Sequence, residues 1–293
     1  MESVHKTVLL NETIEGLNLK PNSIILDCTF GGGGHSLEIL RRHPKAKVIA
    51  IDQDKSAWEK AKSKFKGLED RITFVNANFK EIDEKKIDAI IFDLGLSSDQ
   101  LENSGRGFSF MKDEPLLMTM KENPGLEDVT AYDIVNTWEE KNLADIIYGY
   151  GEERFSRRIA RGIVDGRQKK EIKTTLDLVK IIGDSVPVAY RRARLHFATR
   201  TFQALRIAVN DELGVLQTGL GKGFNALKMG GRMAVISFHS LEDRIVKRFY
   251  QNKAKENKAI LINKKPILVS VEEIKNNPRS RSAKLRILEK INN

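Results

Sequence analysis

Short runs of aliphatic and β-branched residues alternate with amphipathic stretches along the first hundred residues. Residues 24–30 have the pattern of a buried strand and lead directly into four consecutive glycines. Strands are also predicted at 47–51, 72–75 and 88–93, with helices at 35–42 and 56–65, the latter capped by Ser56. Four strand–helix repeats predict an α/β fold with a doubly wound, mostly parallel sheet. Its ligand should lie at the carboxyl ends of the strands.

The pattern changes after residue 107. No strand-like run occurs between 108 and 198, where stretches such as 152–164 predict amphipathic helices. Further elements are then expected: helices at 201–213, 216–227 and 241–250, a buried strand at 232–238, weaker strands at 267–271 and 285–288, and a solvated lysine-rich loop at 253–265. We therefore predict a sheet domain formed by 1–107 and 199–293, interrupted by an all-helical insertion at 108–198.

The glycine run and an acidic residue indicate a nucleoside-containing cofactor. Glycines after a strand let a ligand approach the backbone closely, although such turns are also common without a ligand. Asp52 ends the second strand about twenty residues later, where a carboxylate can accept hydrogen bonds from both ribose hydroxyls. Ser36 occupies the third glycine position of the dinucleotide pattern. Nicotinamide dinucleotide and S-adenosylmethionine both remain open at this point.

Two later residues favour S-adenosylmethionine. Phe79 follows the third strand, where its ring can lie against an adenine, or it can simply belong to the core. Asp93 ends the fourth strand, where it can bind a cationic cofactor or cap a helix. A carboxylate suits a sulfonium and an α-amino group but repels a pyrophosphate. The order glycines, Asp52, Phe79, Asp93 therefore favours a methyltransferase.

Charge and cysteine content narrow the partners. Lys and Arg number 50 against 40 Asp and Glu, a net charge of +10, which favours a polyanion such as nucleic acid. Cys28 is the single cysteine, so we expect no disulfide, no cysteine-based zinc cluster and no metal site. No signal-peptide or membrane-length apolar run is present, and we expect a cytoplasmic protein without a membrane partner. Monomer and homodimer remain open.

Seven segments of the chain resemble the RsmH (MraW) family of ribosomal RNA methyltransferases, in the same order and nearly end to end. They are TFGGGGHS (29–36), DLGLSSDQL (93–101), RGFSF (106–110), YGEERF (150–155), RTFQALRI (200–207), ISFHSLEDR (236–244) and NPRSRS (277–282).

This resemblance implies a function and a set of cofactor contacts. The family methylates the exocyclic N4 of a cytidine in the decoding region of small-subunit ribosomal RNA. Free RNA and the assembled subunit both remain open as the substrate of this chain. The fold implied is the class I methyltransferase fold interrupted by a helical domain. S-adenosylmethionine would be bound by Gly33, Gly34, His35, Asp52, Phe79, Asp93 and Gln100.

The chain departs from the family at two places in or near the insertion. Leu117 and Thr119 stand where the family usually has an acid and a base, and Phe197 stands where it usually has proline. Neither place belongs to the expected cofactor set. These departures therefore bear on substrate positioning.

Methyl transfer to an amine needs alignment and a proton acceptor. The N4 lone pair of cytosine is delocalised into the ring, so an acceptor near the amine would make it more nucleophilic. We expect Asp93 to take this role and His239 to accept or relay the proton, unless His239 only bonds its own loop. Ser97 and Ser98 can orient the base or merely form a turn.

Two basic stripes are candidates for phosphate contacts. They are Arg154, Arg157, Arg158 and Arg161 in the insertion, and Arg279, Arg281, Lys284 and Arg286 near the C-terminus. Glu152 and Glu153 adjoin the first stripe, which can also be a solvated helix face. The second stripe contains no acid before Glu289 and is the better candidate. A nicotinamide dehydrogenase and a non-catalytic RNA-binding protein are the competing functional classes.

Overall fold

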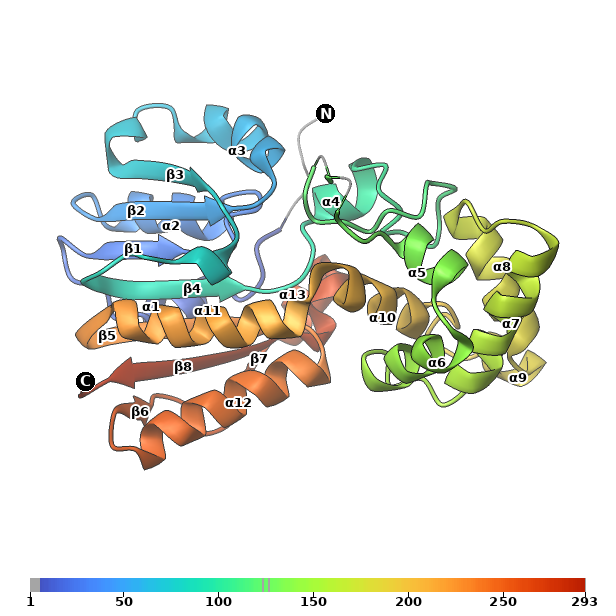
Figure 1. Ribbon diagram of the computed structural model, residues 1–293. Coiled ribbons are helices and arrows are strands. Elements are labelled where there is room, and N and C mark those ends of the chain that lie inside the picture. Colours follow the sequence, from blue (N-terminus) through green and yellow to red (C-terminus); the bar gives the residue numbers. More distant parts are fainter. Residues whose placement is uncertain (1–5, 123, 126, 293) are drawn as a thin grey trace. The chain divides into compact units, whose positions relative to one another are not determined.

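The chain divides into two compact units, shown in the computed structural model in Figure 1, which describes residues 6–122, 124–125 and 127–292. One unit combines Met1–Ser97 with Leu213–Asn293, and the other is Ser98–Glu212. The second unit is longer at both ends than the insertion expected at 108–198. It takes in a short helix before that segment and a long helix after it.

One mixed sheet organises the first unit. Its strand order is β3-β2-β1-β4-β5-β8-β6, with β7 paired to β8. The five strands from β3 to β5 in this order are parallel, and β8 runs antiparallel to its neighbours. The predicted α/β class with a mostly parallel sheet is confirmed. The strands are β1 (Ile24–Asp27), β2 (Lys47–Asp52), β3 (Ile72–Asn76), β4 (Ile87–Asp93), β5 (Leu227–Ser237), β6 (Ala259–Leu261), β7 (Ile267–Leu268) and β8 (Lys284–Lys290).

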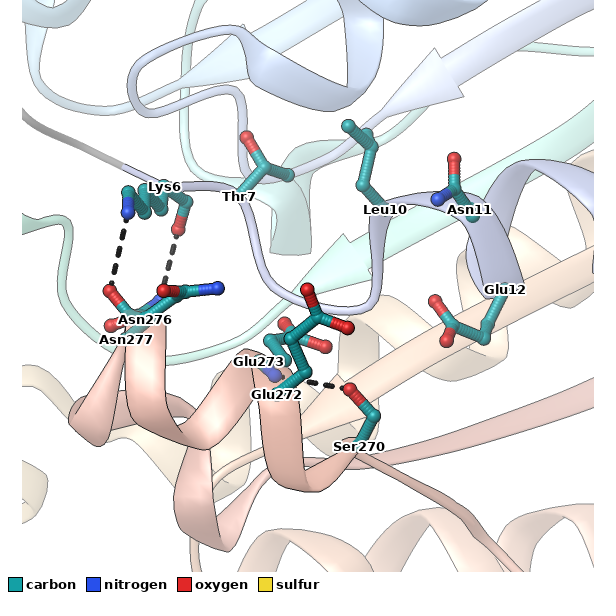
Figure 2. A pocket seen from close by; sticks show the side chains of 10 residues that line it. All are labelled: Lys6, Thr7, Leu10, Asn11, Glu12, Ser270, Glu272, Glu273, Asn276 and Asn277. Atoms are coloured by element: carbon teal, nitrogen blue, oxygen red, sulfur yellow. Dashed lines mark hydrogen bonds between the residues drawn. The ribbon is translucent and has the colours of Figure 1, made fainter.

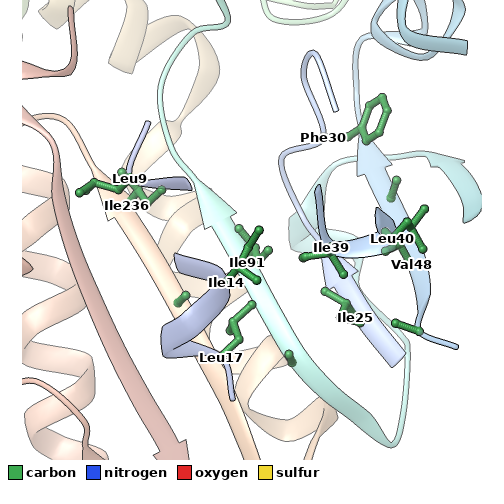
Figure 3. Close-up of a cluster of buried hydrophobic side chains, with 14 of the residues drawn as sticks. Leu9, Ile14, Leu17, Ile25, Phe30, Ile39, Leu40, Val48, Ile91 and Ile236 are labelled. Carbon is green, nitrogen blue, oxygen red and sulfur yellow. The ribbon is translucent and has the colours of Figure 1, made fainter. Parts of the chain in front are cut away.

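Helices cover both faces of this sheet because successive strand residues point to opposite sides. Along β4, Ile91 packs with the cluster that includes α1, α2 and α3, whereas Ile90 and Phe92 pack with α11 and α12. Figure 3 shows the first of these clusters, with Ile25 and Ile91 beneath helix residues. The helices of this unit are α1 (Leu10–Gly16), α2 (Gly34–Arg42), α3 (Lys55–Ala61), α11 (Glu212–Ala226, beginning at the boundary), α12 (Ser240–Lys255) and α13 (Val271–Asn276), with short 3-10 turns at Lys62–Phe65, Glu69–Arg71, Phe79–Glu81 and Pro278–Ser282.

Several local predictions were wrong in detail. Asp54, not Ser56, caps α3, because the Asp54 carboxylate accepts both the N–H and the hydroxyl of Ser56. The lysine-rich span expected to be a loop contains the end of α12 and all of β6. The strand predicted at 232–238 begins earlier, at Leu227, and its register against β4 shifts between Ile87 and Ala89.

The second unit consists of helices. Its described residues form no strand, and a single bridge joins Pro115 to Thr174. Thr130 and Thr174 open two of the helices with reciprocal side-chain caps. The helices are α4 (Ser98–Asn103), α5 (Ala131–Thr137), α6 (Glu140–Gly149), α7 (Ser156–Lys169), α8 (Thr175–Ser185), α9 (Val188–Arg191) and α10 (Thr199–Asn210). Among the described residues of both units, no helix has the length and apolar content of a bilayer span.

Candidate active site at the strand ends

Three neighbouring strands of the sheet each end in aspartate. Asp27, Asp52 and Asp93 close β1, β2 and β4, and β1 lies between the other two. The chain leaves β1 toward β2 on one side and returns to β4 on the other, so this edge is the switch point of the sheet. Parallel strands place their carboxyl ends along the same edge. The three carboxylates therefore line one site.

Asp52 is anchored by backbone groups on both oxygens. Oδ2 accepts the N–H of Gly31 at 2.8 Å and Oδ1 accepts the N–H of Asp54 at 2.9 Å. Burial raises the pKa of Asp52 to about 6, although these two hydrogen bonds lower it. Each oxygen retains a further lone pair. The carboxylate is thus held where it can accept from two vicinal hydroxyls.

Asp93 has one oxygen free of hydrogen bonds within the described part of the chain. Its backbone N–H donates to Oγ1 of Thr29 at 2.6 Å, and Oδ2 lies 3.7 Å from Nδ1 of His35. Oδ1 is buried without a hydrogen-bond partner among the described residues. Burial raises the pKa of Asp93 well above its usual range, and repulsion from Asp27 and Glu242 adds to this. A buried, unpaired carboxylate oxygen is costly unless a ligand satisfies it, so the site suits a cationic or amine-bearing group.

The glycine turn is shaped by packing. Gly33 has φ +73°, and a Cβ there would lie 2.7 Å from the ring of Phe30. A Cβ on Gly34 would lie 1.7 Å from Oγ1 of Thr7, so the N-terminal segment rests directly on the start of α2. Both positions require glycine for this reason alone. His35 follows them and is buried beside Asp93.

Phe79 and Gln100 have different settings. The ring of Phe79 meets Phe92 edge-on at 5.3 Å between centroids, and a Cβ on Gly219 would lie 2.6 Å from it. The ring is therefore packed in the core on one side and half-exposed on the other. Gln100 lies in α4 of the second unit, whereas the other predicted cofactor residues belong to the first.

His239 caps α12. Its Nδ1 accepts the N–H of Glu242 at 3.4 Å, while the Glu242 carboxylate accepts the N–H groups of Phe238 and His239. Nε2 of His239 lies 3.2 Å from Oε1 of Glu242. This reciprocal capping accounts for Nδ1 of His239, whereas Nε2 is buried without a hydrogen-bond partner among the described residues. The same Glu242 carboxylate contributes, by repulsion, to the raised pKa of Asp93.

Sequence reasoning missed Asp27 and the side chains that hold it. Asp27 is 2% exposed and accepts the hydroxyl of Ser36 at 2.6 Å, and burial raises its pKa to about 6. Ser36, which breaks the dinucleotide pattern, thus bonds to a strand-end carboxylate. The available signal was that three predicted strands lead into aspartate. Ser97 lies close to Gly31, and the side chain of Ser98 is outside the described part of the structure.

Two residues of the C-terminal basic stripe, Lys284 and Arg286, are paired with an acid. Arg286 is 7% exposed and binds Asp243 through Nε at 2.7 Å, and Lys284 reaches the same carboxylate at 3.4 Å. The acid comes from α12, far away in sequence, so inspecting neighbouring residues could not reveal it. Arg286 is therefore buried and paired, and Lys284 is partly exposed but paired with the same acid. Arg279 and Arg281, on the 3-10 turn, are exposed.

The departures from the family pattern are packed inside the second unit. Thr119 is buried and donates to the carbonyl of Lys121 at 3.0 Å. The backbone of Leu117 bonds to Pro115 and Ala131. The ring of Phe197 stacks on His196, with centroids 4.3 Å apart.

A hollow of about 350 Å³ lies elsewhere on the first unit (Figure 2). The segment around Lys6 and Leu10 forms one wall and α13 the other, tied together by hydrogen bonds of Lys6 with Asn276 and Asn277. Its lining includes Glu272. None of the predicted site residues lines it, so it is separate from the strand-end site.

Comparison with known proteins shows the family of the chain. Residues 2–291 match the family described as the MraW methylase family. The chain is 50% identical over 291 residues to ribosomal RNA small subunit methyltransferase H of Acaryochloris marina, covering 98% of this chain and 94% of that protein. It is 46% identical to the proteins of the same name from Brevibacillus brevis (98% of each chain) and Clostridioides difficile (99% and 100%). The chain therefore belongs to the MraW methylase family.

Proposed function

We propose that this protein transfers a methyl group from S-adenosylmethionine to the exocyclic N4 of a cytidine in small-subunit ribosomal RNA. The relatives named above are ribosomal RNA small subunit methyltransferases, and each matches this chain over essentially its whole length. The observation that carries the proposal is the unsatisfied Oδ1 of Asp93 beside two further strand-end carboxylates. A group of carboxylates with an unsatisfied acceptor oxygen fits a cationic nucleoside cofactor, which stabilises their charged forms, and disfavours a pyrophosphate.

The residues present fit that cofactor. Asp52 would bind the two ribose hydroxyls through the lone pairs that Gly31 and Asp54 leave available. Asp93, with His35 beside it, would meet the amino-acid end or the reacting amine. The half-exposed side of Phe79 offers an apolar surface for the adenine. The cofactor supplies a methyl group on a positively charged sulfur.

Asp93 is the first candidate for the proton acceptor. Its raised pKa makes it a stronger base than an ordinary carboxylate, which favours accepting a proton from an amine. A hydrogen bond to Oδ1 would also draw the N4 lone pair out of conjugation. His239 can act only if it gives up part of its capping of α12, so we place it second.

The direct test is transfer of labelled methyl from S-adenosylmethionine to small-subunit ribosomal RNA, followed by mass spectrometry of the nucleosides. We expect N4-methylcytidine, and the same assay on naked RNA and on assembled subunits identifies the preferred form. Methylation of another atom, or RNA binding without transfer, would contradict the proposal.

Asp93→Asn should lower the rate of transfer by about 10²- to 10⁴-fold, the usual range for a general base. The matched control is Asp83→Asn, an exposed aspartate of the same unit. Equal rates of methyl transfer in the two variants would show that Asp93 is not the proton acceptor.

A further inference from the structure

Arginine side chains in the second unit are stacked on aromatic rings. The guanidinium of Arg154 lies 4.8 Å from the ring centre of Phe155 and 5.2 Å from that of Tyr190, and Arg158 lies 5.8 Å from Phe155. The two rings meet edge-on at 4.9 Å. We call Arg154, Phe155, Arg158 and Tyr190 the arginine–ring cluster. It joins the start of α7 to α9, which lie near each other in Figure 1.

The cluster is fixed from below by a buried carboxylate. Glu153 is fully buried and accepts the hydroxyl of Tyr190 at 2.5 Å and the N–H of Phe155 at 2.8 Å. Glu153 therefore holds the ring of Tyr190 through its hydroxyl and the backbone of Phe155 through its N–H. A guanidinium that rests on aromatic rings held in this way loses less freedom on binding than an arginine in water.

The arginines around the cluster are exposed, although the buried carboxylate of Glu153 lies next to them. Arg154, Arg157 and Arg158 are exposed, and so are Arg191, Arg192 and Arg194 just after Tyr190. In the part of the chain that the structure describes, none of these six forms an ion pair. Arg161, further along α7, does pair with Glu140 at 3.7 Å. The basic stripe expected along α7 is thus divided, and its N-terminal part continues onto α9.

We propose that the arginine–ring cluster and the adjoining Arg191, Arg192 and Arg194 bind the sugar–phosphate backbone of the substrate RNA, independently of base sequence. The inference rests on the proposed function for the identity of the RNA. A guanidinium with one face on a ring presents its N–H edge outward, which matches the oxygens of a phosphate. Contacts of this kind position a nucleic acid without reading its bases.

The first test is the salt dependence of RNA binding. In Arg154→Ala with Arg158→Ala, the slope of log K against log salt should flatten by about 1.4–1.8, since each lost phosphate contact removes about 0.7–0.9. The matched control is Arg161→Ala with Lys169→Ala, which removes the same charge from α7 itself, away from the rings. An equal flattening by the control would show that overall charge, not the cluster, determines binding and would overturn the proposal.

A second pair of variants separates geometry from charge. Arg154→Lys with Arg158→Lys keeps both charges but loses the planar stacking and the forked donors. We expect RNA affinity to fall several-fold while the salt slope stays close to that of the wild type. Full affinity in the lysine variant would mean that the rings do not matter. Calorimetric S-adenosylmethionine binding on every variant verifies that the protein is folded.

Kinetics distinguish this inference from the proposed function. With the alanine variant, KM for RNA should rise roughly tenfold or more while kcat at saturating RNA is retained, because the cluster contributes to binding only. If the wild type binds RNA and the alanine variant shows the flatter salt slope, but neither methylates RNA, the proposed function fails and the RNA-binding role of the cluster is supported. If the wild type methylates and the variant matches it in KM and slope, this inference fails alone.

Discussion

Asp52 is held by N–H groups of Gly31 and Asp54, whereas Asp93 keeps a buried oxygen without a described partner. Asp27, between them, is bonded to Ser36 and has the smallest exposure of the three. The three strand-end aspartates thus differ in their hydrogen-bond partners and in their burial. Asp52 and Asp93 were predicted from the sequence because strand ends are where ligands bind. The different pKa values of Asp52 and Asp93 could not be predicted, because these values depend on burial and, for Asp93, on Glu242, which is far away in the chain.

Asp52→Ala should weaken S-adenosylmethionine binding by at least about tenfold, since hydrogen bonds to a charged acceptor are worth ~1.5–3 kcal/mol each. Calorimetry measures this, and a melting curve confirms that the fold survives. Unchanged affinity would mean that Asp52 serves only the turn that it binds through Gly31 and Asp54.

Asp27 should make stability depend on pH. Its pKa of about 6 in the folded protein exceeds the ordinary 3.8. Between these values the folded state binds a proton that the unfolded chain does not, so the free energy of unfolding falls as pH rises from about 4 to about 6. Asp27→Asn should reduce that fall in urea unfolding followed across this range. The pKa of Asp52 is raised to a similar value, so part of the pH dependence should remain. If Asp27→Asn leaves the pH dependence of unfolding unaltered, Asp27 does not cause it.

Among elements, the parallel strands and the helices that cover them could be predicted because their apolar periodicity is strong. β6 was missed because it has only three residues in a lysine-rich setting and is stabilised by pairing with β8, a contact that no local pattern reports. The start of α3 was misplaced because two adjacent candidates, Asp54 and Ser56, both suit a cap. Local pattern therefore predicted which elements exist better than where they begin.

The start of α2 offers a test at this scale. Gly34→Ala would place a Cβ against Oγ1 of Thr7, so we expect lower thermal stability and displacement of the N-terminal segment. Thr7→Gly in the same chain should recover most of the loss, because the obstructing side chain is gone. If the two changes are simply additive in a double-mutant cycle, the contact is not the cause.

At the scale of the whole molecule, the sheet unit has its own core. Both large apolar clusters consist of residues of the first unit and lie on the two faces of its sheet. The sequence predicted a helical insertion but placed its limits inside those of the second unit, because α4 and α10 give no compositional sign of which unit they join. We propose that the sheet unit binds the cofactor and that the helical unit serves the RNA.

Replacing residues 98–212 by a short linker should therefore leave S-adenosylmethionine binding measurable and abolish methyl transfer. Calorimetry and the methylation assay report the two properties separately. Gln100 is removed with the helical unit, so some loss of cofactor affinity is expected. Loss of folding as well would show that the second unit is needed to stabilise the first.

The position of β8 has a consequence for how the chain folds during synthesis. β8 is the partner of β5, β6 and β7, yet it follows all three in the sequence. Until residues 284–290 have left the ribosome, β5 presents an open edge and the two short strands have nothing to pair with. An open strand edge of this kind, in a strand that contains Val235 and Ile236, is a site for aggregation. A nascent chain stalled before residue 284 should therefore depend on chaperones in a way that the finished protein does not.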